Sequence, residues 1–131
     1  ALGEAWTVAK KSNLDLTKAF KGISASSGNS FVHETESQVI LNGSYNINFT
    51  MDLVEKDMTL FNNLAKKLGA PLEISPLVLD IFKDGHKKYG SRAWSSMIVK
   101  RMEELNNTNF RAEGFPSELI DNEPEEKGYE I

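Results

Sequence analysis

The sequence has no cysteine among its 131 residues and only two histidines, His33 and His86. Without cysteine there are no disulfides and no thiolate metal ligands, and two histidines are too few for a histidine-rich metal site. Disulfides are typical of secreted proteins, so their absence favours a reducing compartment. We therefore expect a cytoplasmic protein without a bound metal.

The sequence also lacks a strong excess of charge and any long apolar run. It has 15 Lys and Arg residues against 19 Asp and Glu residues, a formal net charge of -4. Such a chain has no strong positive field to attract phosphate backbones or anionic lipids. No apolar segment is long enough to span a membrane, and no basic-then-apolar signal segment is found. Nucleic acids and membranes are therefore not expected as partners.

Alternation of apolar and polar residues, the pattern of a half-buried strand, is confined to the short stretch 45–49. The predicted fold class is therefore all-α, a compact domain of several helices. Apolar residues at helical spacing predict helices over residues 1–12, 16–23, 31–41, 51–68, 76–89 and 94–105. The expected N-caps are Asp15, Thr50 and Ser75, and the expected stops are Asn13, Gly69 and Gly90.

The composition changes at about residue 105. Residues 1–105 form one expected helical domain, of a size that can bury a single core. Residues 106–131 contain glycine, proline and an acidic cluster, and are expected to form an extended or disordered acidic tail. The chain opens directly on helix-forming residues without a cap, which indicates a helix entered midway; a processed N-terminus would explain the same start.

One residue breaks the amphipathic pattern of the expected helix 51–68. On a helical wheel Asp57 falls near the middle of the apolar arc, and Lys56 falls on its edge. The arc consists of Leu53, Val54, Leu60, Phe61, Leu64 and Leu68. Because an unpartnered carboxylate is costly to bury, Asp57 is expected to be paired or to open onto a wet cavity. It is either a buried structural carboxylate or part of a ligand site.

The segment from Ser24 to Ser30 is rich in Ser, Gly and Asn. Its hydroxyls and the backbone N–H groups around Gly28, followed by a helix N-terminus, could hold a carboxylate or phosphate. An ordinary turn capped by Ser30 explains the same pattern, and Phe31 could equally be a core residue. A hydrolase triad built on His33 is not supported, because the sequence has no nucleophile elbow.

Four segments carry a resemblance to a known family. They are Ala1-Leu2-Gly3-Glu4-Ala5, Ala9-Lys10-Lys11-Ser12-Asn13-Leu14-Asp15, Ser26-Ser27-Gly28-Asn29-Ser30-Phe31 and Phe49-x-x-x-Leu53-x-x-Lys56-Asp57-Met58-x-Leu60. In this order and spacing they resemble the C-terminal half of the β-hydroxyacid dehydrogenases, the family of 3-hydroxyisobutyrate dehydrogenase and tartronate semialdehyde reductase. The match covers about residues 1–99, and the lysine-aspartate motif is its most specific part.

The resemblance implies a helical domain like the C-terminal domain of 6-phosphogluconate dehydrogenase, lying against a partner subunit. In this family a separate N-terminal Rossmann domain binds NAD or NADP, and the catalytic lysine precedes the segment matched here. The chain would thus hold no catalytic residue, and the fingerprint of that Rossmann domain is absent from it.

Lys56 and Asp57 match the family's cofactor-binding pair, in which the lysine lies beside the nicotinamide and the aspartate supports the site. Ser27, Gly28 and Phe31 are the substrate-binding candidates. Glu36 stands where some members have a tyrosine, and Ala93 replaces a late aspartate of the family.

The resemblance therefore predicts half of an NAD(P)-dependent oxidoreductase that interconverts a small 3-hydroxy acid and its semialdehyde. This half would supply the wall of the substrate cleft and a subunit interface, in a homo-oligomer, and would be inactive alone. A different hypothesis remains open from the sequence, namely a stand-alone helical interaction or dimerisation module without catalytic activity.

Overall fold

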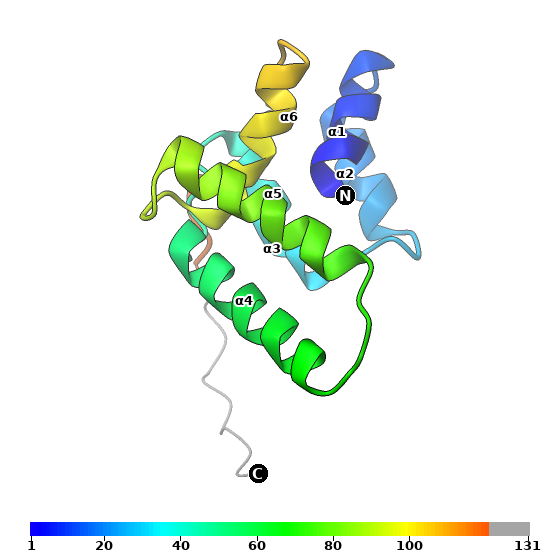
Figure 1. The fold of residues 1–131 in the computed structure, drawn as a ribbon. Helices are drawn as coiled ribbons and strands as arrows, with labels where there is room; N and C mark the ends of the chain where they lie inside the picture. Colours follow the sequence, from blue (N-terminus) through cyan, green and yellow to red (C-terminus); the bar gives the residue numbers. More distant parts are fainter. Residues whose placement is uncertain (121–131) are drawn as a thin grey trace.

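The computed structural model describes residues 1–120, and these fold as predicted into an all-helical domain (Figure 1). The elements are α1 (Leu2–Lys11), α2 (Leu16–Ser24), α3 (Phe31–Asn42), α4 (Met51–Lys67), α5 (Ile74–Tyr89), the 3-10 helix η1 (Ser95–Val99) and α6 (Lys100–Leu105). Within residues 1–120 no helix is long and apolar enough to cross a membrane.

Local capping chemistry sets most helix ends where the sequence predicts them. Asp15 accepts a 2.9 Å hydrogen bond from the backbone N–H of Lys18 at the start of α2. Asn13 ends α1 in the left-handed region at φ 58°, and Gly90 ends α5 at φ 97°. These helix ends could be predicted from the sequence because each depends on a short-range contact or on a backbone angle that few residues adopt.

Two local expectations are wrong, and a third holds in position only. Helix α5 begins one residue before Ser75, whose Oγ accepts a 2.9 Å hydrogen bond from Asn62 Nδ2 and so ties α5 to α4 instead of capping a helix. Thr50 occupies the N-cap position of α4 as expected, but its hydroxyl donates to the Asp52 carboxylate and bonds no backbone N–H. The stretch 94–105 is divided into η1 and α6.

The core lies between α1, α2, α3 and the last helices. Its buried apolar residues are Trp6, Leu16, Ile40, Leu41, Tyr45, Val99 and Phe110. Helices α4 and α5 form an antiparallel hairpin beside this core, drawn in green in Figure 1. Gly85 allows α5 to approach η1 closely, because a Cβ at that position would meet Ile98 Cδ1 at 2.5 Å.

The packed structure continues beyond α6. Residues 106–120 form no helix, yet Phe110 is completely buried, and Ala112 N donates a 3.0 Å hydrogen bond to Leu41 O. The expected limit at residue 105 is thus the end of the helices but not the end of the core. Glycine and proline predict irregular backbone without showing whether that backbone packs. The acidic cluster at 121–126 lies outside the described residues.

Candidate functional site

Helix α4 carries both cofactor-site candidates in its second turn. Lys56 Nζ lies 3.1 Å from Asp57 Oδ1, and the two side chains are 59% and 56% exposed. The expectation that Asp57 is a buried carboxylate is therefore wrong. Among the described residues neither side chain has another hydrogen-bond or ion-pair partner, so both charges are accessible to a binding partner.

Asp57 is exposed because the chain buries a different face of α4. The stripe toward α5 includes the buried Met51 and Ala65. On the same stripe Glu55 Oε2 lies 2.6 Å from Nδ1 of His86 on α5. This stripe is centred about 100° around the helix from the middle of the apolar arc. Amphipathic spacing finds an apolar face, but it does not say which neighbour covers it.

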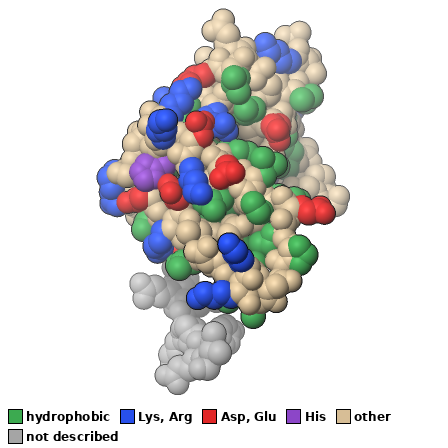
Figure 2. All heavy atoms as spheres, viewed as in Figure 1, with side chains coloured by type: hydrophobic (Ala, Val, Ile, Leu, Met, Phe, Trp, Pro, Cys, Tyr) green, Lys and Arg blue, Asp and Glu red, His purple; other side chains and the backbone are tan. Residues whose placement is uncertain are grey.

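The apolar arc itself is largely exposed. Leu60 and Leu64 are 62% and 54% exposed. We call this surface the α4 apolar face, defined by Leu60, Phe61, Leu64 and Leu68. Figure 2 shows apolar side chains gathered on the side of the molecule where α4 and α5 lie, beside charged side chains of both signs. A cluster of large exposed apolar residues is typical of a surface that binds another protein domain or a ligand.

Ser26 holds the loop between α2 and α3 in a tight turn, and it was not among the substrate-binding candidates predicted from the sequence. Ser26 Oγ donates to Ile23 O at 2.9 Å and accepts from Gly28 N at 3.2 Å. At the end of the loop Ser30 Oγ accepts from His33 N at 3.1 Å, so the N-cap is confirmed. A serine that bonds the backbone two residues later is a recognised turn signal, and it could have been found from the sequence.

The substrate-binding candidates line the outer side of this loop. Ser27 and Gly28 are exposed, and Phe31 is 78% exposed at the start of α3. The alternative in which Phe31 belongs to the core is therefore wrong. A Cβ at Gly28 would meet Ser26 Oγ at an ordinary 3.5 Å, so contacts within this chain do not demand glycine there.

The structure does not bring the cofactor-site pair and the substrate-binding candidates together into one site. The loop lies at the right edge of Figure 1, whereas the first turns of α4 lie at the left. Within residues 1–120 no hydrogen bond or ion pair links Lys56 or Asp57 to Ser27, Gly28 or Phe31. A single site formed by both groups would need a further surface to close it.

Among the carboxyl groups of residues 1–120, Glu36 is the one whose pKa is raised. Burial is the cause, because removal from water disfavours the charged form. Among the described residues the carboxyl has no hydrogen-bond or ion-pair partner that would offset this effect. Glu36 lies on α3, one turn beyond Val32, where the resemblance places a tyrosine in some family members.

His33 is completely buried and belongs to the fold, not to a hydrolase triad. Its Nε2 lies 3.0 Å from Phe20 O, and its Nδ1 lies 3.1 Å from Ser37 Oγ. Since a carbonyl only accepts, Nε2 donates to Phe20 O, and Nδ1 shares a hydrogen bond with the Ser37 hydroxyl. The imidazole has no carboxylate partner among the described residues, and its contacts are those of a histidine that packs within the fold.

A family model with the description "NAD-binding of NADP-dependent 3-hydroxyisobutyrate dehydrogenase" matches residues 1–102. The chain belongs to the 3-hydroxyisobutyrate dehydrogenase family. It is thus a member of an NAD(P)-linked oxidoreductase family, and the matched range contains every candidate site residue on α3, α4 and the loop between α2 and α3.

The relatives that match this chain are longer proteins with oxidoreductase names. The chain is 27% identical over 97 residues to L-threonate dehydrogenase of Haemophilus influenzae, and 26% identical over 97 residues to the enzyme of the same name from Escherichia coli. It is 26% identical over 102 residues to an uncharacterized oxidoreductase of Shewanella frigidimarina. These alignments cover 74% to 78% of this chain but only 32% to 35% of each relative. The chain therefore spans about a third of the length of the relatives it matches.

Proposed function

We propose that this chain is the C-terminal half of an NAD(P)-dependent oxidoreductase that interconverts a small 3-hydroxy acid and its semialdehyde. The observation that carries the proposal is the α4 apolar face. It is left uncovered by the chain's own helices, with an accessible Lys56–Asp57 pair beside it. A face of this kind suits the wall of a cleft whose other side is a nucleotide-binding domain.

The residues of α4 fit a nicotinamide cofactor. Lys56 can lay its methylenes along apolar surface while its ammonium reaches a polar group, and its exposed position leaves the ammonium accessible. Asp57, 3.1 Å away, limits the directions that the ammonium can take. The nicotinamide, when bound, supplies the hydride chemistry. We infer that Lys56 and Asp57 hold and orient it, and that an N-terminal Rossmann domain provides most of the NAD or NADP contacts.

The loop between α2 and α3 suits the acid end of the substrate. The first N–H groups of a helix have no intrahelical acceptor, so the start of α3 can attract a carboxylate. Ser27 adds an exposed hydroxyl, and Gly28 leaves room for close approach to the backbone. Phe31 would cover the apolar part of a small hydroxy acid. These three residues are the proposed substrate contacts.

Within residues 1–120 we assign no residue to the transfer of the hydroxyl proton. The family's catalytic lysine would precede Ala1, so we propose that the 131-residue chain is inactive by itself. Both that lysine and the Rossmann domain would belong to the same complete protein. A homo-oligomer, in which this helical domain contacts a second subunit, and a cytoplasmic location remain parts of the proposal.

The test compares the 131-residue chain with the complete protein. The chain alone should show no turnover of a panel of 3-hydroxy acids with NAD or NADP, and the complete protein should show turnover. In the complete protein Lys56→Ala should lower kcat/KM by about a hundredfold, whereas Lys66→Ala, an exposed lysine near the other end of α4, should change it less than about twofold. Turnover by the isolated chain, or equal effects of the two variants, would contradict the proposal.

A second candidate function uses the same exposed face. The α4 apolar face would also serve a stand-alone helical interaction or dimerisation module. The two functions differ in what precedes residue 1 in the complete protein. A strand, a G-x-G-x-x-G turn and a helix together with cofactor-dependent activity support the dehydrogenase. Their absence, with binding of a helical partner through Leu60 and Leu64, would support the module.

A further inference from the structure

The segment that follows α6 lies outside the range matched by the family model, which ends at residue 102. It nevertheless contacts three helices, α6, α3 and α2. Phe110 N donates a 2.7 Å hydrogen bond to Glu103 Oε1 on α6, and Asn42 Nδ2, at the end of α3, donates a 2.9 Å bond to Phe115 O. We call residues 106–116 the C-terminal strap. Because the strap is not part of the matched family domain, membership of the family does not explain why it packs against these helices.

The strap reaches α2 through a chain of aromatic rings. The rings of Phe115 and Phe20 meet edge-on with centroids 5.1 Å apart. On its other side Phe20 packs against the His33 imidazole at 4.6 Å, and His33 in turn stacks on Trp6 at 5.8 Å. Contacts of this length between rings are directional and hold their members in a narrow range of positions.

His33 is joined to both ends of the loop that holds the substrate-binding candidates. Its Nε2 lies 3.2 Å from Oγ of Ser24, the last residue of α2, and 3.0 Å from Phe20 O. Its backbone N–H donates to Ser30 Oγ at 3.1 Å, at the start of α3. Because His33 belongs to α3 and its ring contacts the last turn of α2, the ring connects the two helices on either side of the loop.

We propose that the C-terminal strap positions the substrate loop, with Phe115 acting through Phe20 and His33. The strap does not touch the substrate, and none of the three is a catalytic residue. The inference rests on the proposed role of Ser27, Gly28 and Phe31 in substrate binding. Its geometric part stands on the contacts themselves, so it is tested first without any assay of activity.

The geometric test measures amide hydrogen exchange in the 131-residue chain. In Phe115→Ala the amides of Gly28, Asn29 and His33 should exchange about tenfold faster, while those of α5 keep their rates. Phe115→Tyr, which keeps the ring, should restore slow exchange. Ile120→Ala, an exposed apolar residue of the same irregular segment, is the matched control and should change none of these rates. Unchanged loop amides in Phe115→Ala, or an equal acceleration throughout the chain, would overturn the proposal.

A double-mutant cycle tests whether the effect passes through the histidine. His33→Gln keeps an N–H donor for Phe20 O but removes the aromatic contact. If Phe115 acts through His33, adding Phe115→Ala to His33→Gln should change the loop exchange rates by less than about twofold, because coupled residues are not additive. Multiplication of the two single effects would show independent action and would contradict the proposed route.

The functional test uses the complete protein. Phe115→Ala should raise KM for the hydroxy acid by about tenfold, with kcat and KM for the nicotinamide nucleotide changed less than twofold. Phe115→Tyr should restore the wild-type KM. Altered loop exchange with an unchanged KM would mean that the loop is positioned but does not bind substrate. A complete protein without dehydrogenase activity would instead reject the proposed function, while the exchange experiment would still decide the role of the strap.

Discussion

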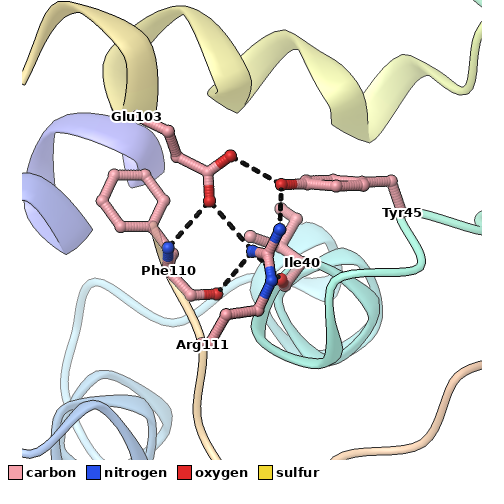
Figure 3. Close-up of polar contacts among 5 residues, drawn as sticks. All are labelled: Ile40, Tyr45, Glu103, Phe110 and Arg111. Atoms are coloured by element: carbon pink, nitrogen blue, oxygen red, sulfur yellow. Dashed lines mark hydrogen bonds and ion pairs between the residues drawn. The ribbon is translucent and has the colours of Figure 1, made fainter. Parts of the chain in front are cut away.

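The Tyr45 hydroxyl donates a 2.6 Å hydrogen bond to Glu103 Oε2, and it joins the connection after α3 to α6 (Figure 3). The other oxygen of the Glu103 carboxylate accepts from Phe110 N at 2.7 Å and from Arg111 at 2.9 Å. Both oxygens of the buried carboxylate thus accept hydrogen bonds, and the Arg111 guanidinium balances its charge, as a buried charge requires. Burial, followed by the hydrogen bond to Glu103, raises the pKa of Tyr45 to about 12.

Tyr45→Phe should lower the free energy of unfolding at pH 7 by about 1.5 to 3 kcal/mol, because it removes a bond to a charged group. It should also change stability at high pH. The folded-state pKa of Tyr45 is about 12, above the ordinary 10.0, so its contribution is full below pH 10 and is lost as pH rises toward 12. Urea unfolding between pH 9 and about 12 should show a shallower decline in the variant. An identical decline would contradict the assigned pKa.

Gly43→Ala should be more destabilising than Gly69→Ala. Both glycines have positive φ, 96° and 66°, so alanine strains the backbone at either position by about 1 to 2 kcal/mol. Only at Gly43 would the new Cβ also collide with the Arg111 guanidinium; at Gly69 nothing lies within 4 Å. Thermal unfolding of the two variants measures the difference. Adding Arg111→Ala should bring the cost of Gly43→Ala down to that of Gly69→Ala.

Features that depend on a few neighbouring residues could be predicted from the sequence. The stop at Asn13 and the caps at Asp15 and Ser30 are examples, since each is a contact across no more than four residues or a single unusual backbone angle. The all-helical class follows from many such features together. The role of Ser75 was missed because its partner, Asn62, lies on another helix.

Burial was less predictable than helix formation. Asp57 lies within an apolar arc, but the chain covers the adjacent stripe with α5 and leaves that arc in water. The packing of the C-terminal strap was not predicted, because the segment is polar and contains glycine. Phe110 is its single buried residue, and one apolar residue gives no pattern from which burial could be inferred. The contact between Tyr45 and Glu103 joins residues 58 positions apart, and no periodic pattern reports such a pair.

Glu36→Gln should stabilise the 131-residue chain at neutral pH. Burial raises the pKa of the Glu36 carboxyl, so the ionised form is less favourable in the folded than in the unfolded chain. This unfavourable effect develops as pH rises through the ordinary value of 4.5, and it is absent when the carboxyl is protonated in both states. Chemical denaturation should therefore show a stabilisation at pH 7 that disappears near pH 3. Equal stability of the wild-type chain and Glu36→Gln at pH 7 would contradict this prediction.

The isolated chain should self-associate through the α4 apolar face. Exposed clusters of large apolar residues are uncommon on monomeric proteins, and two copies that pair would remove this surface from water. Sedimentation equilibrium should show dimers or larger species at high protein concentration. Leu64→Glu should restore the monomer, whereas Leu105→Glu should not, although Leu105 on α6 is also exposed. A monomeric wild-type chain would contradict this prediction.

Lys56 and Asp57 should contribute little to the stability of the 131-residue chain but should both be needed by the complete dehydrogenase that we propose. Their ion pair is exposed, and pairs of this kind contribute about 0 to 1 kcal/mol. Lys56→Ala and Asp57→Ala should therefore shift the unfolding free energy of the chain by less than about 1 kcal/mol.

In the complete protein the same substitutions should lower kcat/KM per folded molecule, Lys56→Ala by more than Asp57→Ala, because the lysine is the proposed direct contact to the nicotinamide. A buried structural role for Asp57 gives the opposite pattern, a large loss of stability with normal turnover of the molecules that fold. Thermal unfolding of the chain and kinetics of the complete protein, measured on the same two variants, separate these outcomes. Unchanged kinetics in both variants would contradict the proposed place of α4 in the active site.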